Sequence, residues 1–160
     1  MAGELWKMPP LVKVYEALGA IGDGRVRIAD ARRAFVTSSD GSKTYEVETS
    51  EDGGEISSND NASYWQGYLG YPAIAVMIAR GLIRPDETAV HALAGVAWKQ
   101  LNTRYRNDYD RTIEDVTRRA AERGCDPAAL RAAAQAVLDS LRALAPRRGP
   151  RRRPPRSRMK

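Results

Sequence analysis

Apolar residues spaced three or four positions apart mark several helical segments along the chain. The first begins after Pro9-Pro10 and carries its apolar side chains on one face (Leu11, Val14, Tyr15, Leu18, Ile21). Further segments with this spacing cover residues 86–105, 112–123 and 127–145. Such a period predicts amphipathic helices that bury one face against a shared core.

A different pattern, alternation bounded by turn residues, occupies the region between the first helix and residue 60. It predicts strands at residues 26–36, 43–49 and 55–58, although residues 29–34 are also compatible with a helix. The turn at residues 38–43 contains Asp40-Gly41, in which the glycine can supply a positive φ. We therefore expect a three-stranded antiparallel meander.

The stretch from Ser57 to Ile83 is the least ordinary part of the sequence. A polar run leads to four aromatic residues interleaved with glycines, and Pro72 then precedes an apolar run that ends before Gly81. Proline near a helix start and glycine just past its end are typical helix boundaries. This order predicts the end of a strand, an aromatic loop, and a short buried helix.

Together these segments predict an α+β fold: a leading helix, a small antiparallel meander and C-terminal helices. Residues 1–10 are expected to be a flexible lead-in, 11–145 a single domain, with its C-terminal helices in 86–145, and 146–160 a disordered tail. A winged-helix-like arrangement of the first helix and the hairpin is an alternative.

The basic charge of the chain is concentrated in that tail. Of 26 basic residues, eight lie after Pro146 with no acidic residue among them, which leaves 18 basic and 20 acidic residues in the body. Four prolines and seven arginines cannot build a core, so we expect this segment to stay extended. The basic tail residues are Arg147, Arg148, Arg151, Arg152, Arg153, Arg156, Arg158 and Lys160.

Val36–Val47 reads VTSSDGSKTYEV, and Gly70–Val76 leads into an apolar run. On these residues the segment 34–81 resembles a SWIM-type zinc finger. The first stretch is similar to the family's lead-in strand VxSSxGxxYxV, with one more residue between Gly41 and Tyr45, and the second to the place where the family has Cys-x-His and an apolar helix. The resemblance implies a module for DNA binding or protein interaction.

The four positions that would hold zinc in such a finger carry other residues here. They are Ser57, Asn59, Gly70 and Pro72, none of which offers a thiolate or an imidazole. The resemblance therefore implies a finger that has lost its metal, and we expect no metal and no cofactor. Side-chain hydrogen bonds from residues 58–61 and burial of the aromatic residues are expected to take over the folding role of zinc.

The aromatic loop is the first candidate binding site. Its rings can stack on single-stranded bases or form a partner surface. The alternative is that the rings bury against the following helix, an interpretation favoured for Trp65 and Tyr68 but evenly balanced for Tyr64 and Tyr71.

The basic tail is the second candidate site. An extended arginine-rich segment binds phosphate backbones without reading sequence, and this binding weakens with salt. A solubility tail, a dock for an acidic protein and a contact with a membrane surface are the alternatives. The mixed segment 104–111 is interpreted as a solvated helix junction, because Asp108 and Asp110 offset its arginines.

Little in the sequence favours an enzyme. His91 is the single histidine and has no cysteine near it, Cys125 has no evident base, and phosphate-binding and nucleophile-elbow motifs are missing. One cysteine cannot form a disulfide within the chain, and the longest apolar run, at residues 71–79, is too short to span a bilayer. We expect an intracellular protein without a signal peptide or membrane partner.

The sequence thus predicts a non-catalytic nucleic-acid-binding or accessory protein, with DNA and RNA both open as partners. In this hypothesis the tail contacts phosphates and the aromatic loop stacks on bases. The alternative is a protein–protein adaptor that docks through the aromatic loop or the last helix.

Overall fold

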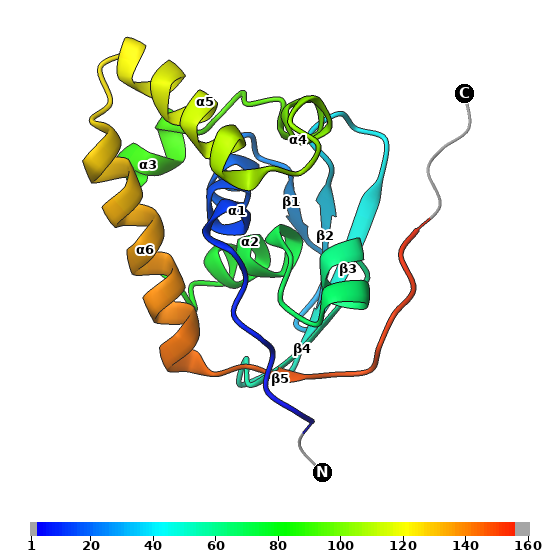
Figure 1. Cartoon of the computed structure of the whole chain (residues 1–160). Coiled ribbons are helices and arrows are strands. Elements are labelled where there is room, and N and C mark those ends of the chain that lie inside the picture. Colours follow the sequence, from blue (N-terminus) through cyan, green and yellow to red (C-terminus); the bar gives the residue numbers. More distant parts are fainter. Residues whose placement is uncertain (1–2, 156–160) are drawn as a thin grey trace.

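A five-stranded sheet forms one side of the molecule in the computed structural model, which describes residues 3–155 (Figure 1). The strands are β1 (Val26–Ile28), β2 (Arg33–Thr37), β3 (Thr44–Thr49), β4 (Glu55–Ser58) and β5 (Arg147–Arg148), and they lie in that order. The first four are antiparallel neighbours, whereas β5 runs parallel to β4. The α+β class predicted from the sequence is confirmed.

Two of the strand predictions needed correction. Residues 26–36 are two strands rather than one, because the Asp30 carboxylate accepts hydrogen bonds from the backbone amides of Arg32 and Arg33 and turns the chain there. The sheet has five strands instead of three, because residues 26–36 form two strands and Arg147–Arg148 add β5. The turn between β2 and β3 is as predicted, with Gly41 at a φ of 76°.

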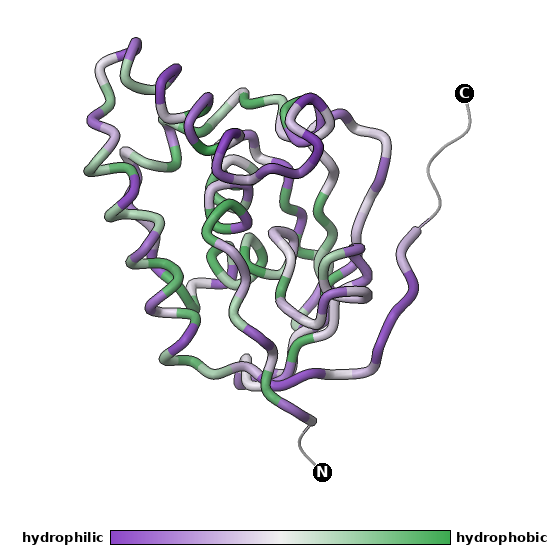
Figure 2. Tube along the Cα trace, viewed as in Figure 1, coloured by the Kyte–Doolittle hydropathy of each residue, from purple (hydrophilic) through white to green (hydrophobic). Residues whose placement is uncertain are grey.

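The core lies between the sheet and the helix α1 (Leu11–Gly22). Helix α2 (Tyr71–Ala79) packs against the sheet on one side and against α1 on the other, and its residues from Pro72 to Ile78 are buried. Figure 2 shows α2 as an apolar segment inside the molecule. The short buried helix predicted from Pro72 and Gly81 is confirmed.

Three further helices pack on α1: α3 (Glu87–Ala92), α5 (Tyr109–Glu122) and α6 (Pro127–Leu144) (Figure 1). Helix α4 (Trp98–Arg104) lies beside the turn between β2 and β3, where Lys99 contacts Ser39 and Asp40. The single helix predicted over residues 86–105 is divided into α3 and α4, because Gly95 adopts a φ of 79° between them. None of the helices within residues 3–155 combines the length and hydrophobicity that a bilayer crossing requires.

The N-terminal segment and the beginning of the tail pack on each other. Trp6 is 6% exposed, and its indole nitrogen donates a hydrogen bond of 3.0 Å to the Ile56 carbonyl oxygen in β4. Its backbone amide donates to the Pro146 carbonyl, and Leu5 forms a bridge with Arg147. The predictions of a flexible lead-in and of a tail that is disordered from Pro146 are wrong for these residues. Residues 156–160 lie outside the described chain.

One carboxylate in α5 gives the fold an expected acid dependence. The Tyr105 hydroxyl donates to Asp115, and Arg119 Nε lies 2.6 Å from Asp115 Oδ1, so the pKa of this buried carboxyl is lowered. A lowered folded-state pKa stabilises the protein above the unfolded value of about 4, and this contribution is lost as the pH falls through the folded-state pKa.

We therefore expect the free energy of unfolding to fall more steeply below about pH 4 in the wild type than in Asp115→Asn. Urea denaturation at a series of pH values measures this difference. Asp110→Asn removes a charge from the exposed first turn of the same helix and serves as the control. Equal pH profiles for wild type and Asp115→Asn would contradict the assignment.

Candidate functional site

The aromatic stretch forms a single turn of π-helix, η1 (Ala62–Gln66), between β4 and α2. The Asp60 carboxylate holds its start by accepting hydrogen bonds from the Ser58 and Ser63 hydroxyls and from the Ser63 amide. Gly67, with a φ of 75°, ends the turn. Only Ser63 of the five residues is buried, so the turn directs the rings next to it outward.

The four aromatic residues consequently separate into two groups. Trp65 is 67% exposed, and its ring meets the half-buried Tyr64 ring edge-on at 4.7 Å. Tyr68 is half-buried, and Tyr71 lies at the start of α2 with its ring 6.2 Å from that of Tyr45. The burial favoured for Trp65 is wrong, because a short π-turn does not continue the apolar face of α2.

The tail arginines approach η1 from the other end of the chain. The Arg151 guanidinium lies 4.1 Å from the centre of the Tyr64 ring and donates to the Tyr64 carbonyl oxygen at 2.9 Å. The Arg148 guanidinium lies 4.8 Å from the centre of the Trp6 ring. The structure thus joins the aromatic loop and the basic tail, which the sequence presents as separate candidates.

Lys7 completes this arrangement, although no motif in the sequence marks it. Its amide donates to the Gly67 carbonyl at 3.1 Å. A Cβ placed on Gly67 would lie 3.6 Å from Arg148 Nη1 and 3.9 Å from Lys7 Cδ, so both side chains lie over the end of η1. We name the five residues the basic-aromatic surface: Lys7, Tyr64, Trp65, Arg148 and Arg151. Its three cations form no salt bridge with a carboxylate of residues 3–155.

The other predicted tail residues have different surroundings. Arg152 forms ion pairs with Glu46, at 3.5 Å, and with Glu48, so its charge is neutralised on the sheet. Arg147 donates to the Gly3 carbonyl, and Arg153 is exposed. The remaining three, Arg156, Arg158 and Lys160, lie outside the described residues.

The positions that resemble zinc ligands are used for hydrogen bonds. Asn59 Oδ1 accepts from the Glu46 amide, and the Gly70 amide donates to the Ser63 hydroxyl. Ser57 is buried in β4. Asp60 also accepts from the Ser63 amide, so side-chain hydrogen bonds expected from residues 58–61 are present. Within residues 3–155 no three His, Cys, Asp or Glu side chains are arranged to hold a metal.

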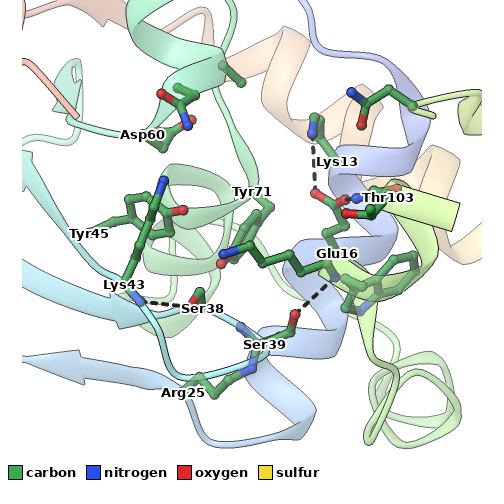
Figure 3. Close-up of a pocket in the computed structure, with 16 residues that line it drawn as sticks. Lys13, Glu16, Arg25, Ser38, Ser39, Lys43, Tyr45, Asp60, Tyr71 and Thr103 are labelled. Atoms are coloured by element: carbon green, nitrogen blue, oxygen red, sulfur yellow. Dashed lines mark hydrogen bonds and ion pairs between the residues drawn. The ribbon is translucent and has the colours of Figure 1, made fainter. Parts of the chain in front are cut away.

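A polar pocket of about 240 Å³ lies on the other side of η1 (Figure 3). Its walls come from α1, from the turn between β2 and β3, from the start of η1 and from α4. The side chains that matter chemically are Lys13, Glu16, Arg25, Lys43, Tyr45, Asp60, Tyr71, Lys99 and Asn102. None of them belongs to the basic-aromatic surface. The sequence could not indicate this pocket, because its residues are far apart along the chain and form no motif.

The buried Glu16 carboxylate organises one side of the pocket. It is 3% exposed, lies 3.5 Å from Lys13 Nζ and accepts a hydrogen bond of 2.6 Å from Asn102 Nδ2. Burial alone would lower the pKa of Lys13, but the charge of Glu16 and nearby tyrosine hydroxyls outweigh it and raise that pKa. Burial, with a contribution from Asp60, raises the pKa of Tyr45 to about 12. The pocket therefore presents ammonium groups and a protonated phenol at neutral pH.

Comparison with known families shows where the chain belongs. The model of the family described as uncharacterised conserved protein UCP014422 matches residues 6–147. The chain belongs to this family. The UCP014422 match extends from Trp6 to Arg147, so it includes Trp6 and Lys7 but ends within β5, before Arg148 and Arg151. No curated protein and no solved structure matches the chain.

Proposed function

We propose that this protein is a non-catalytic binder of single-stranded nucleic acid, DNA or RNA, and that the basic-aromatic surface is its recognition site. The observation that carries the proposal is the exposed Trp65 ring beside three cations that have no carboxylate partner among the described residues. Cys125, the single cysteine, is consistent with a place inside the cell.

Both parts of the surface suit a single strand. A tryptophan face accepts any base, and stacking contributes about 1–3 kcal/mol per base. The Arg151 guanidinium is already held against Tyr64, so it can donate to a phosphate oxygen with little loss of side-chain freedom. Arg153 and the remaining basic residues of the tail would add phosphate contacts without sequence preference.

Trp65→Ala is expected to weaken binding of a single-stranded oligonucleotide by about 5- to 150-fold, which corresponds to the loss of one stacked base. Fluorescence anisotropy with labelled single-stranded DNA, single-stranded RNA and duplex DNA measures the change. Ile28→Ala removes another exposed apolar side chain, on β1 at the opposite edge of the sheet from β5, and should leave affinity unchanged.

The same titration at a series of salt concentrations separates phosphate contacts from base stacking. Arg151→Ala should reduce the slope of log affinity against log salt by about 0.7, the value for one phosphate contact on a single strand. Arg152→Ala should change it less, because Glu46 and Glu48 already hold that guanidinium. Unchanged affinity in Trp65→Ala together with an unchanged slope in Arg151→Ala would refute the proposal.

The exposed tryptophan also favours a second candidate, a protein–protein adaptor. Tryptophan and arginine are the residues most enriched among those that dominate protein interfaces. Retention of a protein complex at high salt, lost in Trp65→Ala, would support this role in place of nucleic-acid binding.

A further inference from the structure

The polar pocket is large enough to admit a small molecule. Its volume of about 240 Å³ is several times the roughly 30 Å³ that one water molecule occupies in the liquid. In Figure 3, Tyr71 lies between Lys43 and Tyr45 on one side and Lys13 and Glu16 on the other, with Arg25 and Ser39 below. Charged side chains from five separate segments of the chain thus surround one space.

The lining of this pocket carries more positive than negative charge. Four cationic side chains line it, Lys13, Arg25, Lys43 and Lys99, against two carboxylates. Both carboxylates already have donors: Lys13 and Asn102 contact Glu16, while Ser58 and Ser63 contact Asp60. The lining therefore has more donors than it can satisfy internally.

The four cations differ in whether a carboxylate neutralises them. Lys13 pairs with Glu16, Arg25 with Asp23 at 3.1 Å and Lys99 with Asp40 at 3.2 Å. Lys43 is half-buried and forms no salt bridge within residues 3–155. A half-buried ammonium group without a counter-ion is the strongest single indication of an anionic ligand.

Arg25 gives a second and independent indication. Its Nε pairs with Asp23 and its Nη1 donates to the Thr37 carbonyl at 2.7 Å. Its Nη2 is buried and has no hydrogen-bond partner within the described chain, and Arg25 is one of the residues that line the pocket. A buried donor without an acceptor costs free energy, and a bound oxyanion is the acceptor that would match a guanidinium.

We propose that this pocket binds a small molecule through an oxyanion, a phosphate or a carboxylate, with Lys43 as the anchoring cation. Small side-chain shifts would bring the Arg25 guanidinium and the hydroxyls of Tyr45 and Tyr71 into the same site as further donors. The pocket shares no residue with the basic-aromatic surface, so ligand binding here can be tested without nucleic acid.

The test is a nuclear magnetic resonance titration of the full chain, without nucleic acid, using inorganic phosphate in one arm and succinate in the other. Saturable shifts of pocket amides, such as those of Lys43, Asn61 and Asn102, at concentrations below about 10 mM support the proposal. The anion that saturates at the lower concentration identifies whether the pocket prefers a phosphate or a carboxylate.

Lys43→Gln keeps the aliphatic stem, removes the charge, and should weaken the better anion by at least about tenfold. The matched control is Arg84→Ala, which removes an exposed cation outside the pocket and should leave the affinity unchanged. Absence of saturable shifts with both anions, or equal affinity in the wild type and Lys43→Gln, would overturn the proposal. Because the wild-type titration stands alone, it decides even where the variant is poorly folded.

Discussion

Gly70→Ala is expected to lower the free energy of unfolding by about 2–5 kcal/mol, although Gly70 has an ordinary extended backbone. A Cβ on this residue would lie 1.9 Å from Asp60 Oδ2 and 2.6 Å from Asp60 Cγ. The buried Asp60 carboxylate would have to move away from the Ser58 and Ser63 donors that hold it. The loss combines steric strain with broken hydrogen bonds to a charged group.

A double-mutant cycle isolates this contact. Asp60→Ala removes the obstacle, so Gly70→Ala should cost much less in the Asp60→Ala background than in the wild type. The matched control is Gly54→Ala, whose added Cβ would meet an exposed Asp52 side chain at 3.2 Å. Urea denaturation of the wild type, the two single variants and the double variant measures the cycle, and additive losses would rule out the proposed clash.

Trp6→Ala is expected to lower the free energy of unfolding by about 3–5 kcal/mol, the usual range for a buried tryptophan. Its ring is buried between the Arg148 guanidinium and the core, and its indole nitrogen donates to the Ile56 carbonyl. Removal of the ring leaves a cavity, an unpartnered carbonyl and an unsupported β5. Chemical denaturation measures the loss, and hydrogen exchange should show faster exchange at Arg147, Arg148 and Gly149.

Trp6→Phe separates the two contributions. Phenylalanine retains most of the apolar contact but cannot donate to Ile56, so a loss of about 1 kcal/mol is expected. Leu5→Ala is the control, because Leu5 is the neighbouring apolar residue and is 52% exposed. If Trp6→Ala changed neither the unfolding free energy nor exchange in β5, Trp6 would not support this edge of the sheet.

The parts of the fold that follow from local sequence could be predicted. Helix α2 is marked by Pro72, an unbroken apolar run and Gly81, and the turn after β2 is marked by Asp40-Gly41. Strand β5 could not be predicted, because Arg147 and Arg148 carry no apolar pattern. Their pairing depends on backbone groups of β4 and on Trp6, which lie more than 80 residues away in the sequence.

In the candidate site, too, local sequence marks some residues, whereas contacts between distant segments determine the rest. Tyr64 and Trp65 stand out by composition, but the exposure of Trp65 depends on a π-turn that has no recognised sequence signal. Lys7 and Arg151 meet at this turn only because both ends of the chain pass along the sheet. The polar pocket depends on tertiary packing to an even greater degree, since Lys13, Lys43 and Asn102 converge from separate elements.

The pairing of β5 with β4 also changes what a truncated protein would report. The Arg147 and Gly149 amides donate to the Gly54 and Ile56 carbonyls, and the Arg148 amide donates to Glu4. A chain that stops before Pro146 would leave the outer side of β4 unpaired, and an open strand edge is a template for association with other chains. If such a deletion abolished binding, the loss of cations and self-association through β4 would both explain the result. Single substitutions at exposed arginines keep the backbone hydrogen bonds between β5 and β4.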